Sequence, residues 1–280
     1  MWFAKRFSLK IEKTVNLDPQ KQYILGNHPH AILPFGSMVA LNATTPEKSS
    51  AFQGFDQLFP SLSFRTLAAT FCFYIPGYRE LCLYAGVVDA ARYSARRVLN
   101  CGKSLMLVPG GATEALYCKP NEDIVYLKKR FGFIKLALET GCDLVPVFSF
   151  NECNCWSIID LDESNGHSMT SFFASMIRKL CSECLVLSSH TKAISCCPPG
   201  VAKRRFQRIT GLSLPLVTNL IPRKTKITVV VGRPISVSKV EKPSNKQVES
   251  LLNEYIGALK ALHEKHRARL SPGKPALKVV

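Results

Sequence analysis

The sequence predicts an α/β fold in which helices flank a mostly parallel sheet and an amphipathic helix ends the domain. Two observations predict it. Short apolar runs alternate with helical patterns from about residue 22 to residue 231, and a capped helical pattern begins at residue 244. Such an alternation is typical of parallel sheets, because crossover helices join parallel neighbours. The chain has 280 residues, of which 46% are hydrophobic, and this is enough for a sizeable core.

The individual elements follow from local patterns. Short apolar runs predict buried strands, and apolar residues at helical spacing predict the helices between them. Gly141 is expected to end the helix predicted at 130–139, because glycine readily adopts the left-handed conformation that closes a helix. In chain order we expect strands at 23–25, 104–108, 143–150 and 226–231, with helices at 91–102 and 130–139.

The C-terminal helix is the clearest element in the sequence. Ser244 and Gln247 have the spacing of a capping box, which marks a helix start. Apolar residues then recur at helical spacing and form one face, which favours packing on the core over contact with a membrane. These residues are Val248, Leu251, Leu252, Tyr255, Ile256, Leu259 and Leu262.

The predicted domain organisation is a single domain over residues 1–280. Residues 151–205 are irregular, polar and rich in cysteine, so we expect an insertion there rather than a second core. Eleven cysteines, an odd number, and the lack of a cleavable signal sequence favour a reducing compartment. The clustered cysteines do not form two regularly spaced pairs, so zinc is a minor alternative and no metal is expected.

The chain is strongly basic, with 37 Lys and Arg against 20 Asp and Glu, a net charge of +17. This charge favours an anionic partner, either a membrane surface or a phosphate-bearing molecule. A merely solvated basic face is the alternative. Nucleic acid is not expected as a partner, because the basic residues lie in short scattered runs without a nucleic-acid-binding motif.

No stretch predicts a membrane-spanning helix, which requires about 20 mainly apolar residues. The longest run without charge, residues 22–46, contains three prolines and several polar residues. Apolar residues between Phe71 and Tyr84 are suited to a membrane interface. We therefore expect attachment to a membrane surface without a spanning helix.

Two of the six histidines flank a proline in the stretch GNHPHAILP, directly after the first predicted strand. Histidine exchanges a proton near neutral pH, and Pro29 stiffens the turn that presents His28 and His30. The stretch is therefore a candidate for general-base chemistry. The alternative is a simple turn in which the histidines cap backbone groups.

A second candidate stretch, VPGGATEAL, follows the strand predicted at 104–108. Gly110 and Gly111 allow tight backbone geometry, and amides at a following helix start suit an anion. Glu114 lies where carboxyl ends of parallel strands meet, so its carboxylate can share a crevice with the histidines and support a base. A helix-start acid that interacts with the helix dipole is the alternative. The absence of a Gly-x-Ser-x-Gly motif argues against a serine hydrolase, whereas a cysteine nucleophile stays open.

Seven ordered segments together resemble one family, the type-2 diacylglycerol acyltransferases with their monoacylglycerol and wax-ester relatives. The resemblance covers most of the chain apart from the region near residues 151–205. The segments are Leu17-Asp18-Pro19, YILGNHPHAILPFG, IPGYREL, VPGGATEAL, RFGFIKLALETGCDLVPVFSF, VVVGRPISV and the C-terminal helix through His266.

The resemblance implies a glycerolipid-acyltransferase-like fold and an acyl-CoA-dependent O-acyltransferase. Such an enzyme moves a fatty acyl group from acyl-CoA to the hydroxyl of diacylglycerol and forms triacylglycerol. A monoacylglycerol or long-chain alcohol acceptor is one alternative, and an inactive lipid-binding homologue is another. No resident cofactor is implied, because acyl-CoA is a co-substrate. The implied location is the cytosolic face of the endoplasmic reticulum membrane, or lipid droplets.

The resemblance also implies roles for the histidines. His28 and His30 match the family's His-Pro-His-Gly motif, and plant members with Glu-Pro-His-Ser keep only the second histidine. His30 is therefore the expected base, which takes the proton of the acceptor hydroxyl. Glu114 is expected to orient His30.

Other groups are expected to bind the reacting molecules. Backbone amides near Gly110 and Gly111 would stabilise the oxyanion of the transition state. Arg130, together with its neighbour Lys129, would attract the phosphates of coenzyme A. These assignments complete the predicted site.

The sequence departs from the family pattern in three places. Ala31 replaces the glycine of the histidine motif, and Asn151 replaces the glycine before Glu152 in the family's Phe-Gly-Glu ending. The chain also begins just after the place where relatives carry a hydrophobic membrane hairpin. The expectation is therefore either a truncated form or peripheral binding to the membrane.

Overall fold

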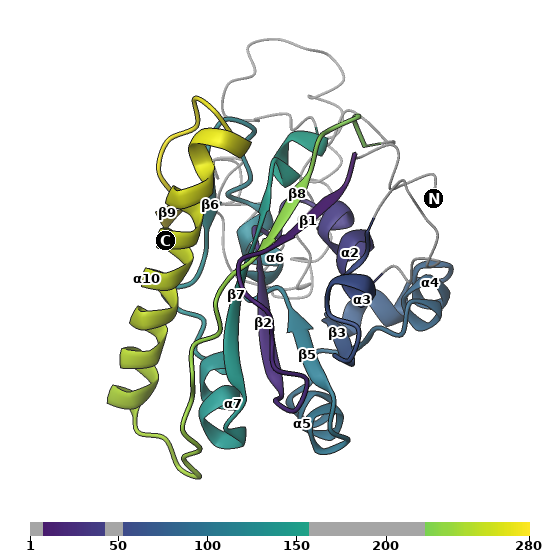
Figure 1. Cartoon of the computed structure of the whole chain (residues 1–280). Coiled ribbons are helices and arrows are strands. Elements are labelled where there is room, and N and C mark those ends of the chain that lie inside the picture. Colours follow the sequence, from purple (N-terminus) through teal and green to yellow (C-terminus); the bar gives the residue numbers. More distant parts are fainter. Residues whose placement is uncertain (1–7, 43–52, 157–221) are drawn as a thin grey trace, which may run out of the picture. The chain divides into compact units, whose positions relative to one another are not determined.

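The computed structural model describes residues 8–42, 53–156 and 222–280, and Figure 1 shows the arrangement of their helices and strands. They form a seven-stranded sheet with the order β1-β8-β7-β2-β5-β3-β4. Its strand pairs are parallel except for β7 and β8, so the predicted mostly parallel α/β fold is confirmed. The strands are β1 (Lys10–Lys13), β2 (Tyr23–His28), β3 (Phe64–Ala68), β4 (Val88–Asp89), β5 (Ser104–Leu107), β7 (Asp143–Phe150) and β8 (Thr228–Val231).

Helices α5, α7 and α10 build the main hydrophobic core on one face of the sheet. Their apolar sides pack against Ile24 of β2, Leu105 of β5 and Leu144 of β7, which are fully buried. In Figure 1, α10 runs along one side of the molecule, where it contacts β7 and α7. The bounds of these helices are α5 (Arg92–Asn100), α7 (Gly132–Thr140) and α10 (Asn245–Leu270).

The side chains of β2 alternate between the two faces of the sheet. Gly26 and His28 contact a residue of α10, whereas Asn27 Nδ2 donates to Ser37 Oγ of α2 on the opposite side at 2.9 Å. The second face is therefore covered by a different set of helices. These are α2 (Phe35–Asn42) and α3 (Phe55–Leu58).

Short elements follow the strands. Because parallel strands end at the same edge, the segments that leave β2, β3, β5 and β7 all emerge at the carboxyl edge of the sheet. Strands β6 and β9 form a separate parallel pair that ties the C-terminal end of the chain to the core. These elements are η1 (Thr70–Tyr74), α4 (Tyr78–Tyr84), α6 (Gly111–Ala115), η2 (Glu152–Cys155), β6 (Ile124–Val125) and β9 (Lys278–Val279).

The sequence signals at the helix ends are confirmed. The Ser244 N–H donates to Gln247 Oε1 at 2.9 Å, and the Gln247 N–H donates to Ser244 Oγ at 3.3 Å, which completes the predicted capping box. Gly141 closes α7 with a φ of +75°. The predicted apolar face of α10 packs on the core, with Ile256 at its margin and His263 as an additional buried member.

Two further expectations concern membranes and the insertion. Among the residues that the structure describes, no helix is long and apolar enough to cross a membrane. The insertion predicted at 151–205 lies outside the described residues from 157 onward. Only its first part, through Trp156, is described, and there η2 packs near α2.

Candidate active site

The two candidate stretches of the sequence meet at the carboxyl edge of the sheet. β2 and β5 are parallel neighbours, so the turns that follow them emerge side by side. The backbone N–H of His30 donates to Glu114 Oε1 at 2.5 Å, and His28 Nδ1 lies 4.0 Å from Glu114 Oε2. The structure therefore brings His28, His30 and Glu114 together, as the sequence predicts.

His30 presents a ring nitrogen with a free lone pair. Its Nδ1 lies 3.1 Å from the carbonyl oxygen of Ala31, an acceptor, so Nδ1 carries the proton. Nε2 has no hydrogen-bond partner among the described residues, and the side chain is half-buried. Burial, with a smaller contribution from Arg130, lowers the pKa of His30 below its ordinary value of 6.5. At neutral pH the ring is therefore uncharged and able to accept a proton.

His28 is instead fully enclosed. The Tyr255 hydroxyl donates to the Gly26 carbonyl at 3.1 Å, so its oxygen accepts from His28 Nε2, also at 3.1 Å. Nδ1 then holds a lone pair that faces Glu114 and has no hydrogen-bond partner in the described part of the chain. Burial lowers the pKa of His28 to about 3, so the ring stays neutral and links α10 to the end of β2.

Glu114 supports the histidine turn through the backbone. Its carboxyl is buried and accepts N–H bonds from His30 and, at 2.7 Å, from Tyr126. Burial raises its pKa to about 7 despite these bonds. Glu114 therefore positions His30 through the backbone N–H of His30 and not through its ring. The imidazole is oriented by the carbonyl of Ala31.

The glycine turn makes room for this carboxyl group. A Cβ atom on Gly110 would lie 2.0 Å from Glu114 Oε2, so only glycine leaves space for the side chain to fold back. The N–H of Gly111 donates to the Val108 carbonyl at 3.1 Å. Of the two amides predicted to stabilise an oxyanion, that of Gly110 is the one without a partner in the described part of the chain.

Arg130 braces the same turn. Its guanidinium donates to the Gly110 carbonyl at 2.7 Å and to Thr113 Oγ1 at 2.8 Å, and it lies 5.1 Å from the centre of the Tyr126 ring. Lys129 is exposed beside it. The guanidinium contacts stabilise the loop that positions Glu114, while binding of coenzyme A phosphates by Arg130 and Lys129 stays a prediction.

The family model described as diacylglycerol acyltransferase matches residues 1–279. The chain belongs to the diacylglycerol acyltransferase family. The family predicted from the seven sequence segments is thereby confirmed, and with it the class of enzyme, an O-acyltransferase.

Similar proteins include diacylglycerol O-acyltransferase 1 of Schizosaccharomyces pombe, 30% identical over 98% of this chain and 71% of its own. Diacylglycerol O-acyltransferase 2 of Danio rerio is 34% identical over 94% of this chain and 66% of its own. Among solved structures, the lysophosphatidic acid acyltransferase PlsC of Thermotoga maritima aligns with a TM-score of 0.47 and 12% identity, covering 96% of this chain and 79% of its own.

Ala31 and Asn151 share a left-handed backbone conformation in this member of the diacylglycerol acyltransferase family. They are the two positions at which glycine was expected. Ala31 has a φ of +51° and Asn151 a φ of +67°. Glycine adopts this left-handed region without strain and asparagine tolerates it, whereas alanine is sterically strained there. A glycine at either position would adopt the observed backbone without this strain.

We expect Ala31→Gly to raise the free energy of unfolding by about 1 kcal/mol, because the substitution removes the strain of a left-handed alanine. Urea unfolding checks this. The matched control is Ala261→Gly on the exposed face of α10, which should lower stability by about 1 kcal/mol. A loss of stability in Ala31→Gly equal to that of the control would show that Ala31 is unstrained.

Two buried residues of this family member have roles that the sequence did not reveal. Tyr255 was predicted only as part of an apolar face, and no periodicity signals that its hydroxyl fixes the His28 tautomer. Glu152 accepts from the N–H groups of Gly36 and Ser37 at 2.8 and 3.0 Å, and so anchors the start of α2. Burial raises the pKa of Glu152 to about 7. Its place after β7, at the same edge as Glu114, is the signal that could have found it.

Proposed function

We propose that this chain transfers a fatty acyl group from acyl-CoA to the hydroxyl of diacylglycerol and so forms triacylglycerol. The observation that carries the proposal is the neutral His30 ring at the carboxyl edge of the sheet, whose Nε2 has no partner among the described residues; the Glu114 carboxyl lies against both the His30 N–H and Gly110. The names of the relatives, diacylglycerol O-acyltransferases, support this acceptor.

The proposed reaction is a direct transfer. His30 Nε2 takes the proton of the acceptor hydroxyl while the oxygen attacks the thioester carbon. The carbonyl oxygen becomes an oxyanion, for which the free Gly110 N–H is a donor. The acyl–sulfur bond then breaks, the ester is released, and the His30 imidazolium returns its proton to the thiolate of coenzyme A.

The test is a transfer assay with membrane fractions that contain the chain and labelled acyl-CoA. Diacylglycerol, monoacylglycerol and a long-chain alcohol are supplied as separate acceptors, and fractions with His30→Ala define the background. We expect labelled triacylglycerol to be the main product above background. A wax ester or diacylglycerol as the main product would reassign the acceptor, and no labelled product from any acceptor would contradict the enzymatic proposal.

The acceptor would come from a membrane that this chain binds at its surface. Large apolar side chains are exposed on η1 and α4, directly after β3 at the carboxyl edge. This set is called the η1–α4 surface. It supports attachment to a membrane surface, because such side chains suit the boundary between headgroups and acyl chains. The membrane that we propose is the cytosolic face of the endoplasmic reticulum or the surface of lipid droplets. The members are Phe71, Tyr74, Ile75, Leu81, Leu83 and Tyr84.

High-salt or carbonate washing is expected to release this chain from membranes, because the proposed attachment uses surface charge and a shallow apolar contact. Replacement of Leu81, Leu83 and Tyr84 by serine should lower binding to anionic liposomes roughly tenfold. Tyr93→Ser, at an exposed tyrosine of α5, is the control and should leave binding unchanged. Retention in the pellet after carbonate would show an embedded segment and contradict peripheral attachment.

A further inference from the structure

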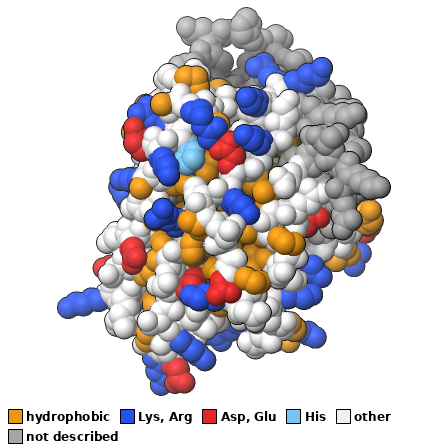
Figure 2. All heavy atoms as spheres, in the orientation of Figure 1, with side chains coloured by type: hydrophobic (Ala, Val, Ile, Leu, Met, Phe, Trp, Pro, Cys, Tyr) orange, Lys and Arg blue, Asp and Glu red, His pale blue; other side chains and the backbone are white. Residues whose placement is uncertain are grey.

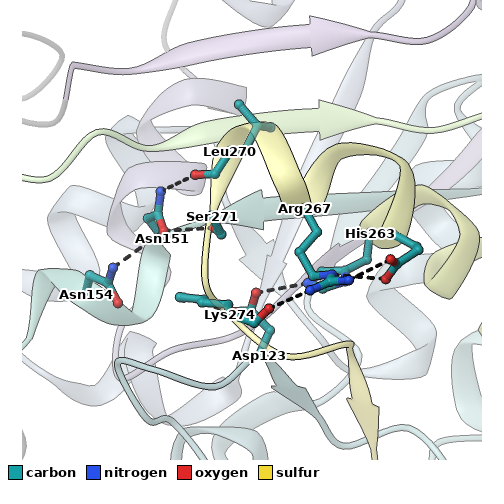
Figure 3. A network of polar contacts seen from close by, with 9 residues as sticks. Asp123, Asn151, Asn154, His263, Arg267, Leu270, Ser271 and Lys274 are labelled. Carbon is teal, nitrogen blue, oxygen red and sulfur yellow. Dashed lines mark hydrogen bonds and ion pairs between the residues drawn. The ribbon is translucent and has the colours of Figure 1, made fainter.

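A cavity of about 510 Å³ lies at the carboxyl edge of the sheet, between the end of α10 and the segment that leads into β8. Figure 3 shows some of its lining residues from close by, with Asn151 facing Leu270 and Ser271 at the end of α10 and Asn154 pointing toward Asn151. The lining residues are Pro120, Asn121, Asn151, Asn154, Arg223, Lys224, Thr225, Lys226, Leu270, Ser271, Pro272 and Lys274.

The cavity carries positive charge without a compensating acid in its lining. Arg223, Lys224 and Lys226 are exposed, and none of them forms an ion pair with a described residue. Lys274 differs, because it is buried and donates to Asp123 Oδ1 at 2.9 Å. Its charge is thereby neutralised in the network of Figure 3, and the other three cations define the character of the cavity.

Asn151 links the two segments that border the cavity, the end of α10 and the segment that leads into β8. Its Nδ2 donates to the Leu270 carbonyl of α10 at 2.9 Å and to the Lys226 carbonyl at 3.3 Å, and its Oδ1 accepts from Ser271 Oγ at 2.9 Å. The Arg223 N–H adds a bond of 2.8 Å to the Cys155 carbonyl. Asn151 occupies the terminal carbonyl of α10, one of the groups that carry the negative partial charge of this helix end, and so lessens its repulsion of an anion in the cavity.

The cavity lies within reach of the candidate active site. Phe148 of β7 is the register partner of His28, and Asn151 follows it by three residues. The strand geometry places Asn151 roughly 10 Å further along and about 5 Å to the side of His28. In the sheet, β7 and then β8 follow β2 on one side. β5 and then β3, which leads into the η1–α4 surface, follow β2 on the other side.

In Figure 2, Lys and Arg side chains extend over the upper part of the face drawn, where Figure 1 shows the end of α10.

We infer that this cavity binds the adenosine 3′,5′-bisphosphate end of coenzyme A, the part of the acyl donor furthest from the thioester. The inference rests on the proposed function, since that function supplies the donor. Guanidinium and ammonium groups form charge-assisted hydrogen bonds with phosphate oxygens. The extended pantetheine arm of the donor then runs from the cavity to His30, while the lipid acceptor enters from the η1–α4 surface on the opposite side.

Calorimetric titration of the full chain with adenosine 3′,5′-bisphosphate tests the inference without any need for turnover. The wild type should bind this nucleotide. The cavity variant combines Arg223→Ala, Lys224→Ala and Lys226→Ala, and it should raise the dissociation constant at least roughly tenfold. Asn151→Gly keeps the left-handed backbone but removes the side-chain hydrogen bonds to Lys226, Leu270 and Ser271. This variant should raise the dissociation constant by a smaller factor. The control removes the same charge from exposed lysines elsewhere, Lys242, Lys246 and Lys260, and should change binding less than about twofold.

Three outcomes would overturn the inference. The first is a wild type that binds no nucleotide, and the second is a cavity variant that binds the nucleotide as well as the control does. The third is a cavity variant that loses only its binding to anionic phospholipid vesicles, which would identify a headgroup surface. In transfer assays, the cavity variant should raise KM for acyl-CoA but leave the rate with an acyl-pantetheine donor, which lacks the nucleotide, unchanged. If wild type binds the nucleotide but transfers no acyl group, the proposed function fails while the binding site stands.

Discussion

Replacement of His30 by alanine is expected to lower kcat by about 10²–10⁴-fold, the usual contribution of a general base. His30 Nε2 has no partner among the described residues and lies on a half-buried side chain, whereas the other unpartnered ring nitrogen, His28 Nδ1, is fully enclosed; burial lowers the pKa of His30, so its ring is mainly neutral at pH 7. Initial rates at saturating acyl-CoA and acceptor measure the loss. Comparable unfolding curves for wild type and variant would separate a lost base from a lost fold.

His28→Ala is the matched comparison, because it removes a neighbouring imidazole that is fully enclosed. It should reduce the rate but leave it measurable, since the variant loses the link to Tyr255 and not the proton acceptor. If His28→Ala abolished turnover while His30→Ala stayed active, the two roles would be reversed.

Gly110→Ala is expected to lower kcat/KM roughly a hundredfold or more. A Cβ atom at this position would lie 2.0 Å from Glu114 Oε2, so the carboxyl group must leave its place. The N–H groups of His30 and Tyr126 would then lose their acceptor, and the histidine turn would shift. Steady-state kinetics with acyl-CoA measure the effect.

The matched control for Gly110→Ala is Gly257→Ala. A Cβ at Gly257 meets nothing within 4 Å, and the position lies within α10, where alanine is the better helix former. This variant should keep full activity and gain a little stability. Full activity in Gly110→Ala as well would mean that Glu114 is not needed in its observed place.

The elements of the fold were predictable where burial repeats at a regular spacing. α10 was found because its capping box and apolar face are local signals, and β7 because it is a continuous apolar run that is buried on both faces. The antiparallel direction of β8 was not predictable, because strand direction depends on the path of the chain between β7 and β8 and not on the composition of either strand.

Part of the candidate site was also within reach of the sequence. His28, His30 and Glu114 follow apolar strands, and strand ends of a parallel sheet meet. Their contacts were not predictable, because they depend on side-chain packing between distant segments. Nothing local indicates that Glu114 binds a backbone amide, that Tyr255 accepts from His28, or that Arg130 braces the glycine turn.

The central claim is that neutral His30 accepts the proton of the acceptor hydroxyl, and the pH dependence of kcat/KM tests it most directly. The pKa of His30 lies below 6.5, so the uncharged base predominates at pH 7 and above, and it is lost as the pH falls through its pKa. The account predicts a one-proton decline with a midpoint below pH 6.5 and a flat profile from pH 7 to about 8. A midpoint at pH 7 that disappears in Glu114→Gln would assign the proton transfer to the carboxyl group, whose pKa is about 7, and contradict the account.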